Sequence, residues 1–172
     1  KESKDMVIEM QKDIKRLETI TERFSKIGSR PALEKTDIVG LISDATSYLK
    51  SRLPKKVQLS TTYKKSPIII PISGVLINWV IENICKNSVD AMKGTGVITI
   101  QIIEEVNDVK INISDSGKGI EKKIFNSIFK PGVTTKKRGW GLGLSLSKRI
   151  VEDYHKGRIF VEKSIEGSGT TF

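Results

Sequence analysis

The sequence predicts an α/β fold, in which helices form one layer on a mixed, mainly antiparallel sheet, preceded by a coiled-coil-like helix. Three observations predict it. Several segments repeat apolar residues with the helical period of about 3.6 residues, and several others alternate apolar and polar residues as half-buried strands do. Proline and glycine separate these segments. Because both kinds of segment occur along one short chain, we expect a two-layer sandwich.

The first 28 residues predict a helix that pairs with another helix. Their apolar residues recur with mostly heptad spacing, while Lys, Glu, Asp and Arg fill the other faces. A helix folded back on its own domain is the alternative. Residues 29–36 are a predicted linker, since Pro31 cannot continue the helix. The spaced apolar residues are Val7, Met10, Ile14, Leu17, Phe24 and Ile27.

The predicted main domain spans residues 37–172. Asp37 can cap a helix that runs to about Leu53, where Pro54 ends it. Residues 129–140 show no periodicity. The other expected helices are 73–92, a short one at about 121–127 and one at 142–155, and the expected strands are 57–63, 97–103, 109–113, 158–162 and 170–172, with an extended connector at 66–71.

Composition is typical of a folded domain with an appendage. The chain has 172 residues, of which 37% are hydrophobic and 29% are charged. No apolar run approaches the roughly 20 residues of a transmembrane helix, and the start carries no signal-peptide pattern, so we expect a soluble chain in the cytoplasm. Cys85, the single cysteine, excludes an internal disulfide and suits a reducing compartment.

The net charge of +10 and the pI of about 9.7 raise the possibility of nucleic-acid binding. Lys and Arg are nevertheless scattered over the whole chain, and their short clusters are not interleaved with aromatic residues. No zinc-finger or RNA-recognition pattern occurs. We therefore interpret most of these charges as solvated surface and expect no nucleic-acid partner.

Two glycine clusters mark places where the backbone turns tightly or approaches a ligand. The first, Asp115-Ser-Gly-Lys-Gly119, follows the strand 109–113 and makes Asp115 a carboxylate at a strand end. The second, Gly139-Trp-Gly-Leu-Gly-Leu-Ser145, opens the helix 142–155, whose first amides favour an anion. A carboxylate and an anion site together suggest a nucleotide. Ordinary turns are the alternative for each cluster alone.

The helix 73–92 carries polar residues on one flank. Asn83, Asn87 and Asp90 stand at i, i+4 and i+7, so they share that flank. Asn prefers caps and turns to helix interiors, because its side chain competes for backbone hydrogen bonds. Two stacked Asn residues therefore indicate a polar ligand.

Five motifs in this order resemble the N, G1, F, G2 and G3 boxes of sensor histidine kinases. Their ATP-binding fold, the Bergerat fold, is shared with DNA gyrase, MutL and the heat-shock chaperone ATPases. The resemblance covers about residues 37–172. The motifs are Asn83-x-x-x-Asn87, Asp115-x-Gly117-x-Gly119, Phe129-Lys-Pro-Gly-Val-Thr-Thr-Lys136, Gly139-x-Gly141-x-Gly143 and Gly167-x-Gly169-Thr-Thr-Phe172.

This resemblance implies that ATP or ADP binds together with Mg²⁺. Asp115 is expected to accept a hydrogen bond from the adenine amino group, where guanine presents a carbonyl and would be rejected. A turn residue before glycine is the alternative for Asp115. Asn87 is the expected Mg²⁺ ligand, and Asn83 is expected to touch a phosphate or a metal-bound water.

The other implied nucleotide contacts come from the helix flank, the glycine loops and the segment 129–140, which we expect to act as a mobile lid. Lys136 and Arg138 are implied to neutralise phosphate oxygens and so to be catalytic together with Asn83 and Asn87. Lys86 is equally explained as surface charge, and Phe129 is expected to anchor the lid. The implied nucleotide contacts are Asn83, Asn87 and Asp115 together with Lys86, Asp90, Gly117, Gly119, Ile120, Phe129, Thr135, Lys136, Lys137, Arg138, Gly139, Gly141, Leu142, Gly143, Leu144 and Thr170.

The resemblance also implies partners. Histidine kinases phosphorylate a histidine on the first helix of a dimerising hairpin, and residues 1–28 resemble the second helix. We find no first helix in this chain, and His155, the only histidine, is not the expected acceptor, because a cation at a helix C-terminus complements the helix dipole. The implied partners are a phosphoacceptor hairpin, a response regulator and, in the parent protein, a second copy paired through the N-terminal helix. Any membrane attachment would come from an upstream segment.

Three alternatives remain. A hydrolytic ATPase of the gyrase or MutL type resembles this chain but carries a glutamate base where Asn83 stands, and Glu82 is rotated by about 100° around the helix. A nucleotide-binding regulatory module without catalysis is suggested by Trp140, a bulky residue beside the second glycine cluster. A serine-kinase relative such as an anti-sigma factor is disfavoured by the heptad helix.

Overall fold

A computed structural model of the protein describes residues 31–134, 136 and 140–172. The predicted helix 1–28 and the predicted contacts Thr135, Lys137, Arg138 and Gly139 lie outside these residues. A compact unit extends from Leu33 to Phe172 and contains the predicted main domain.

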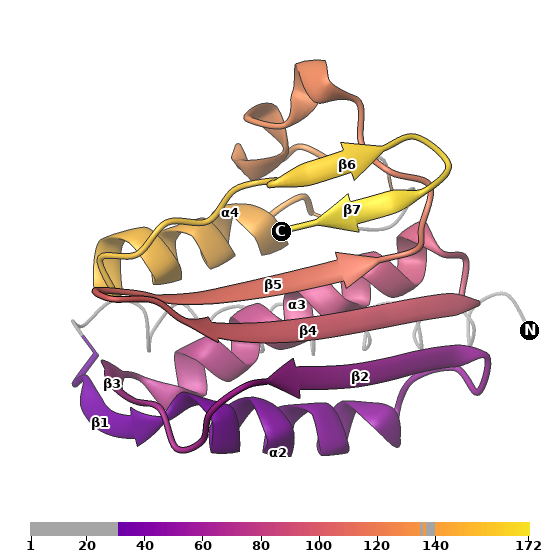
Figure 1. Ribbon diagram of the computed structural model, residues 1–172. Helices are drawn as coiled ribbons and strands as arrows, with labels where there is room; N and C mark the ends of the chain where they lie inside the picture. The colour runs from indigo at the N-terminus through magenta and orange to yellow at the C-terminus, as the bar shows by residue number, and fades with distance from the viewer. Residues whose placement is uncertain (1–30, 135, 137–139) are drawn as a thin grey trace, which may run out of the picture. The chain divides into compact units, whose positions relative to one another are not determined.

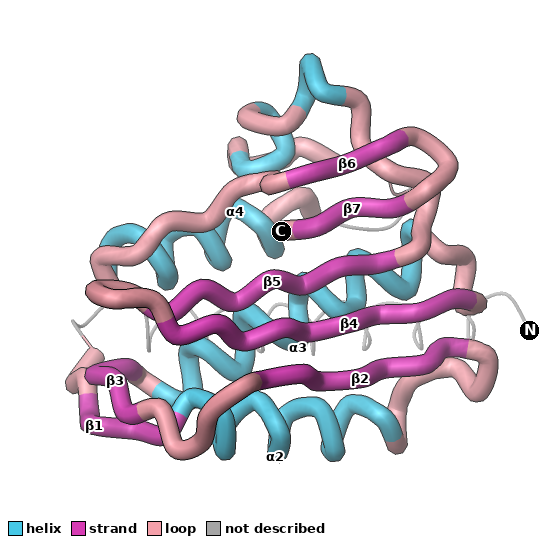
Figure 2. The backbone as a smooth tube through the Cα atoms, in the orientation of Figure 1, coloured by secondary structure: helices cyan, strands magenta, loops and turns pink. Residues whose placement is uncertain are grey.

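A five-stranded mixed sheet forms one layer of this unit (Figures 1 and 2). Its strand order is β2-β4-β5-β7-β6. Only the first pair, β2 with β4, is parallel, and the other three neighbouring pairs are antiparallel. The predicted mixed, mainly antiparallel sheet is therefore confirmed. The strands are β2 (Val57–Tyr63), β4 (Gly96–Glu104), β5 (Val109–Asp115), β6 (Lys163–Ile165) and β7 (Gly169–Thr171).

The helices form the second layer, against one face of the sheet (Figure 1). They are α2 (Ile38–Lys50), α3 (Gly74–Ala91) and α4 (Gly143–Arg149), which continues as a π-helix over Ile150–Tyr154. The predicted short helix at 121–127 consists of two 3₁₀ turns, Lys122–Ile124 and Ser127–Phe129. The two-layer α/β fold class is thus confirmed.

Helix α2 begins where the sequence predicts. Asp37 is its N-cap, and the carboxylate accepts hydrogen bonds from the backbone N–H groups of Val39 and Gly40 at 3.1 and 3.2 Å. The same carboxylate accepts a third hydrogen bond, from Ile68 N at 3.0 Å, and so ties the helix start to the chain before β3. The helix ends at Lys50, three residues before the expected Leu53.

The predicted linker 29–36 is wrong at its C-terminal end, because Glu34–Asp37 form strand β1. This strand pairs antiparallel with β3 (Ile69–Ile72), which lies in the segment expected as an extended connector. Neither strand shows a clear alternation in sequence, since β1 is charged and β3 contains Pro71 opposite Lys35. The pairing of two weak segments is decided by their proximity in the fold.

The predicted strand 158–162 is also wrong, because β6 occupies Lys163–Ile165 instead. The tight turn between β6 and β7 sets this register: Gly167 has a φ of 77°, and Ser168 N donates to Ile165 O at 3.0 Å. Ile165 consequently pairs with Gly169, and the ladder begins later than the apolar pattern indicates.

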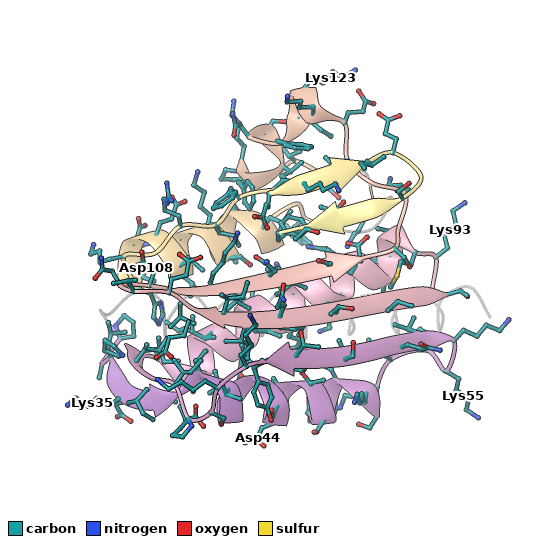
Figure 3. All side chains as sticks on the ribbon, in the orientation of Figure 1. Lys35, Asp44, Lys55, Lys93, Asp108 and Lys123 are labelled. Carbon is teal, nitrogen blue, oxygen red and sulfur yellow. The ribbon has the colours of Figure 1, made fainter. Side chains whose placement is uncertain are left out.

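The core lies between the sheet and the helices. On β4 every second residue is buried, and Ile98, Ile100 and Ile102 are at most 2% exposed. The intervening Val97 and Gln101 face solvent. The charged side chains labelled in Figure 3 project away from the ribbon, so charge lies on the outside of this packing. Within the part of the chain that the structure describes, helices long and apolar enough to span a bilayer are absent.

Cys85 gives a direct test of the core. It is fully buried on α3, and this burial, together with the charge of Glu82, raises the pKa of its thiol to about 12. Since the thiolate is the reactive form, we expect DTNB at about pH 8 to modify Cys85 on the order of a thousandfold more slowly in the native protein than in urea, through transient opening. Equal rates in the two conditions would contradict a buried Cys85.

Candidate functional site

Helix α3 supplies the polar flank of the candidate site. Its opposite face is buried against the sheet through Val80, Ile81, Ile84 and Cys85, which fixes the rotation of the helix. Asn83, Asn87 and Asp90 are partly or fully exposed on the remaining flank. Each of the three side chains contacts an element that lies far away in the sequence.

Asp115, the last residue of β5, is 9% exposed and held by two donors. The Ser88 hydroxyl of α3 donates to Oδ2 at 3.0 Å, and the Gly117 backbone N–H donates to Oδ1 at 2.8 Å. The second contact is the turn geometry that is the alternative interpretation of Asp115. Asp115 can still accept further hydrogen bonds, because each carboxylate oxygen has a second lone pair.

The surroundings of Asp115 suit a polar planar ligand. Thr170, which is 4% exposed, lies opposite Asp115 in the β5–β7 ladder, and its hydroxyl is 2.9 Å from Ser164 Oγ. Ser164 Oγ also accepts from Ile120 N at 2.8 Å. Gly119, with a φ of 75°, passes so close to Ile165 O that a side chain would overlap it. The chain therefore brings Asp115, Gly119, Ile120 and Thr170 together, as predicted from their motifs.

Asn83 connects α3 to α4. Its Nδ2 donates to Ser147 Oγ at 2.9 Å. Its Oδ1 lies against Gly143, the first residue of α4, so closely that any side chain at position 143 would overlap it. Leu142 is the N-cap of α4, and Leu144 follows in its first turn. The structure thus brings the predicted residues Asn83, Leu142, Gly143 and Leu144 together.

The side chains of Asn87 and Asp90 both contact the ammonium group of Lys136. Lys136 Nζ donates to Asn87 Oδ1 at 2.8 Å and lies 2.5 Å from Asp90 Oδ2. A neutral amide oxygen and a carboxylate oxygen are ligands that Mg²⁺ accepts in proteins. Within the described residues there is no cluster of three His, Cys, Asp or Glu side chains that could hold a metal alone. The donor set therefore fits a Mg²⁺ ion that takes most of its ligands from water or phosphate.

Lys86 lies apart from these contacts. Its ammonium contacts Glu82 one helical turn earlier at 2.7 Å, and its side chain is 59% exposed. This geometry matches surface charge, the alternative given for Lys86. Glu82 itself lines a groove of about 350 Å³ between α2 and α3 together with Asp44, Tyr48 and Asn78.

The start of the segment 129–140 is anchored. Phe129 is buried, and its ring meets that of Phe172 edge to face, with 6.3 Å between the centroids. At the other end, Gly141 O accepts from Gly132 N at 3.1 Å. Trp140 is 59% exposed. The cavity of about 360 Å³ beside β2 and β4, like the groove between α2 and α3, is lined by none of the predicted nucleotide contacts.

Comparison with known proteins identifies this arrangement. Residues 74–172 match the family described as "Histidine kinase-, DNA gyrase B-, and HSP90-like ATPase". The chain belongs to this family. The match begins with α3 and ends with β7 and Phe172, so it contains every predicted nucleotide contact.

Several kinases are similar to this chain. Sporulation kinase A of Bacillus subtilis is 34% identical over 133 residues, which are 77% of this chain and 22% of that kinase. Sensor histidine kinase ZraS of Escherichia coli is 32% identical over 166 residues, which are 95% of this chain and 35% of that protein. The chain spans about a third or less of these relatives.

A solved structure agrees. The catalytic domain of histidine kinase ThkA has a TM-score of 0.74 and 25% identity, with 82% of this chain and 93% of that domain covered. Together these findings confirm the predicted identification: the chain contains the ATP-binding catalytic domain of a sensor histidine kinase.

His155 has a different role in this ATPase-family domain from the one its sequence position suggests. Its Nε2 accepts from Ser73 N, the N-cap residue of α3, at 3.0 Å, and its Nδ1 lies 2.8 Å from Ile150 O. A neutral ring with the proton on Nδ1 satisfies both contacts. His155 therefore connects the start of α3 to the end of the π-helix, and the cation expected at this helix terminus does not suit the geometry.

Two residues that support the candidate site were not predicted from the sequence. Ser88 and Ser147 are both at most 1% exposed, and each supports a residue of the site, Asp115 and Asn83 respectively. Each serine interrupts an apolar helical stripe, which was the available signal. A buried serine requires a hydrogen-bond partner, but the sequence does not show which one.

The Ser88 contact predicts a stability effect. Ser88→Ala removes a donor from a buried carboxylate, so we expect the free energy of unfolding to fall by about 1–3 kcal/mol in urea titrations. Ser47→Ala is the control, because Ser47 is exposed on α2 and its hydroxyl donates to Ser43 O. An equal effect of the two substitutions would show that the Ser88 hydroxyl does not support Asp115.

Proposed function

We propose that this chain binds ATP with Mg²⁺ and transfers the γ-phosphate to a histidine on a helical hairpin that another segment of the parent protein supplies. The phosphate then passes to a response regulator. One observation carries the nucleotide assignment: the buried Asp115 carboxylate, held by Ser88 and Gly117 at the end of β5, beside the polar flank of α3.

Asp115 would select adenine. Its remaining lone pairs accept the exocyclic amino group, whereas the carbonyl of guanine would leave a buried charged acceptor facing another acceptor. Gly119, Ile120 and Thr170 line the same end of the sheet. The fixed orientation of Asp115 supports this role, because the two existing hydrogen bonds leave the carboxylate little freedom to turn.

Asn87 would hold Mg²⁺, while the phosphates provide the anionic ligands. Asn83 Nδ2 donates one of its two hydrogens to Ser147, which holds Asn83 against the first turn of α4, so the second hydrogen and Oδ1 remain for a phosphate or a metal-bound water in the proposal. Lys136 is long enough to exchange its contacts on α3 for phosphate oxygens. Thr135, Lys137, Arg138 and Gly139 remain proposed contacts outside the described residues.

In the proposed transfer, an imidazole nitrogen of the acceptor attacks the γ-phosphorus, the bond to the β–γ bridging oxygen breaks, and ADP leaves. This chemistry depends largely on positioning and on charge stabilisation. The contacts of His155 make it a poor acceptor, because Nε2 already accepts from Ser73 N.

The contacts of Glu82 disfavour the hydrolytic alternative. A general base must reach the attacking water, but Glu82 pairs with Lys86 and lines the groove against α2. Asn83, at the position of the family's glutamate base, cannot accept a proton. We therefore retain phosphoryl transfer as the function of this domain.

The proposed partners are the acceptor hairpin, a second copy of the parent protein joined through the helix 1–28, and a response regulator. One structural relative supports the last: histidine kinase ThkA, known in complex with response regulator protein TrrA, has a TM-score of 0.74 and 25% identity to this chain. The proposed location is the cytoplasm, with membrane attachment only through an upstream segment.

The first test concerns the nucleotide. We expect calorimetry to detect ATP and ADP but not GTP, and Asp115→Asn to weaken ATP binding about 5- to 150-fold, because a mispaired buried group costs about 1–3 kcal/mol. Asp108→Asn is the matched control, since Asp108 is exposed and immediately precedes β5, at the end opposite Asp115 (Figure 3). Unchanged ATP affinity in Asp115→Asn would remove Asp115 from the adenine site.

The second test concerns the acceptor. Incubated with radiolabelled ATP, the chain should not label itself but should label a separately produced hairpin of the parent protein that carries its acceptor histidine. Asn87→Ala should abolish this transfer without unfolding the protein, because alanine favours helices. Asn107→Ala, in an exposed loop, is the control. Acid-labile label on His155 that disappears in His155→Gln would overturn the proposal.

A further inference from the structure

The ammonium of Lys136 lies between two oxygens of α3. It donates to Asn87 Oδ1 at 2.8 Å and contacts Asp90 Oδ2 at 2.5 Å. Positions 87 and 90 are i and i+3 on one helix, so their side chains are neighbours and present a two-oxygen site. A side chain from 46 residues beyond Asp90 thus supplies a positive charge where the helix presents oxygen ligands.

We propose that Lys136 competes with the divalent cation for this site, so that Mg²⁺ binds well only after nucleotide phosphates draw Lys136 away from Asn87 and Asp90. The role of the phosphates rests on the proposed function. The competition itself concerns only Lys136, the two oxygens and the metal ion.

Charge and geometry support competition. Asn87 Oδ1 has two lone pairs, but an ammonium and a divalent cation on one oxygen would lie within a few ångströms and repel each other. With Lys136 in place, its charge cancels that of Asp90. Without it, the site has an unpaired carboxylate that attracts a metal ion. A triphosphate carries more negative charge than Asp90 and offers Lys136 a stronger partner.

The size of the effect follows from exposure. The side chains of Lys136 and Asp90 are 40% and 56% exposed, so their ion pair is a surface pair of modest strength. We therefore expect the competition to weaken metal binding about two- to fivefold rather than by orders of magnitude. If Lys136 served only as a phosphate ligand, its removal would weaken nucleotide binding and leave the affinity for metal alone unchanged.

The first experiment uses Mn²⁺ without nucleotide. The full chain, labelled with ¹⁵N, is titrated with Mn²⁺, and paramagnetic broadening of the Asn87 side-chain amide reports binding at this site. Lys136→Met should bind Mn²⁺ about two- to fivefold more tightly than the wild type. Lys86→Met is the control: it removes one positive charge from α3 itself, next to Asn87 in sequence, but Lys86 Nζ contacts Glu82. Equal Mn²⁺ affinities in Lys136→Met and the wild type, or an equal gain in Lys86→Met, would overturn the proposal.

The second experiment measures coupling. In the wild type, ADP should raise the Mn²⁺ affinity by a larger factor than in Lys136→Met, because in the variant there is no lysine to displace, and the same factor must appear when Mn²⁺ is varied and ADP affinity is measured. An equal coupling factor in both proteins would overturn the proposal. A failure to bind any nucleotide would instead overturn the proposed function, while the titrations without nucleotide would still decide the competition.

Discussion

The hydrogen bond between the Ser88 hydroxyl and the Asp115 carboxylate is the contact on which the candidate site depends. It joins the buried side of α3 to the end of β5, so the two elements that carry the polar residues cannot shift relative to each other without exposing an unpaired charge. The Asp115 carboxylate is at once a structural acceptor and the group that faces the nucleotide in our proposal. Stability and recognition therefore use the same side chain.

Helix α3 acts as the common support because its two sides obey different constraints. The apolar side must fill the space under the central strands, which leaves no choice of rotation. The opposite flank is then available for contacts with distant segments. Asn83 contacts α4, and Asn87 and Asp90 contact Lys136. The start of the helix is held as well, through Ser73 and His155. Three distant segments thus meet along this helix, in addition to β5, which Ser88 joins to it.

In our proposal, the charges around α3 favour phosphoryl transfer over ATP hydrolysis. A hydrolase needs a carboxylate that reaches the attacking water, but Glu82 forms an ion pair with Lys86 and lines the groove between α2 and α3. Asn83, on the correct flank, is an amide fixed by Ser147. In our proposal the site therefore has ligands for a metal and for phosphate but, among its described residues, no base placed to activate water. Such a site suits transfer to a nucleophile that another protein segment presents.

The sequence by itself determined the fold class, the edge strand 57–63 and the central strand 109–113, the helix with Asn83 and Asn87, and the place of Asp115 at the end of β5, because periodicity and glycine spacing act locally. Tertiary structure decided what local patterns do not contain. It pairs β1 with β3, places β6 at 163–165 rather than at the predicted 158–162 through the turn at Gly167, and brings His155 to the backbone N–H of Ser73. It also brings the Ser88 hydroxyl to the Asp115 carboxylate. A hydrogen-bond partner or a strand register depends on which segments meet in space, and hydrophobic periodicity specifies only which side of each segment is buried.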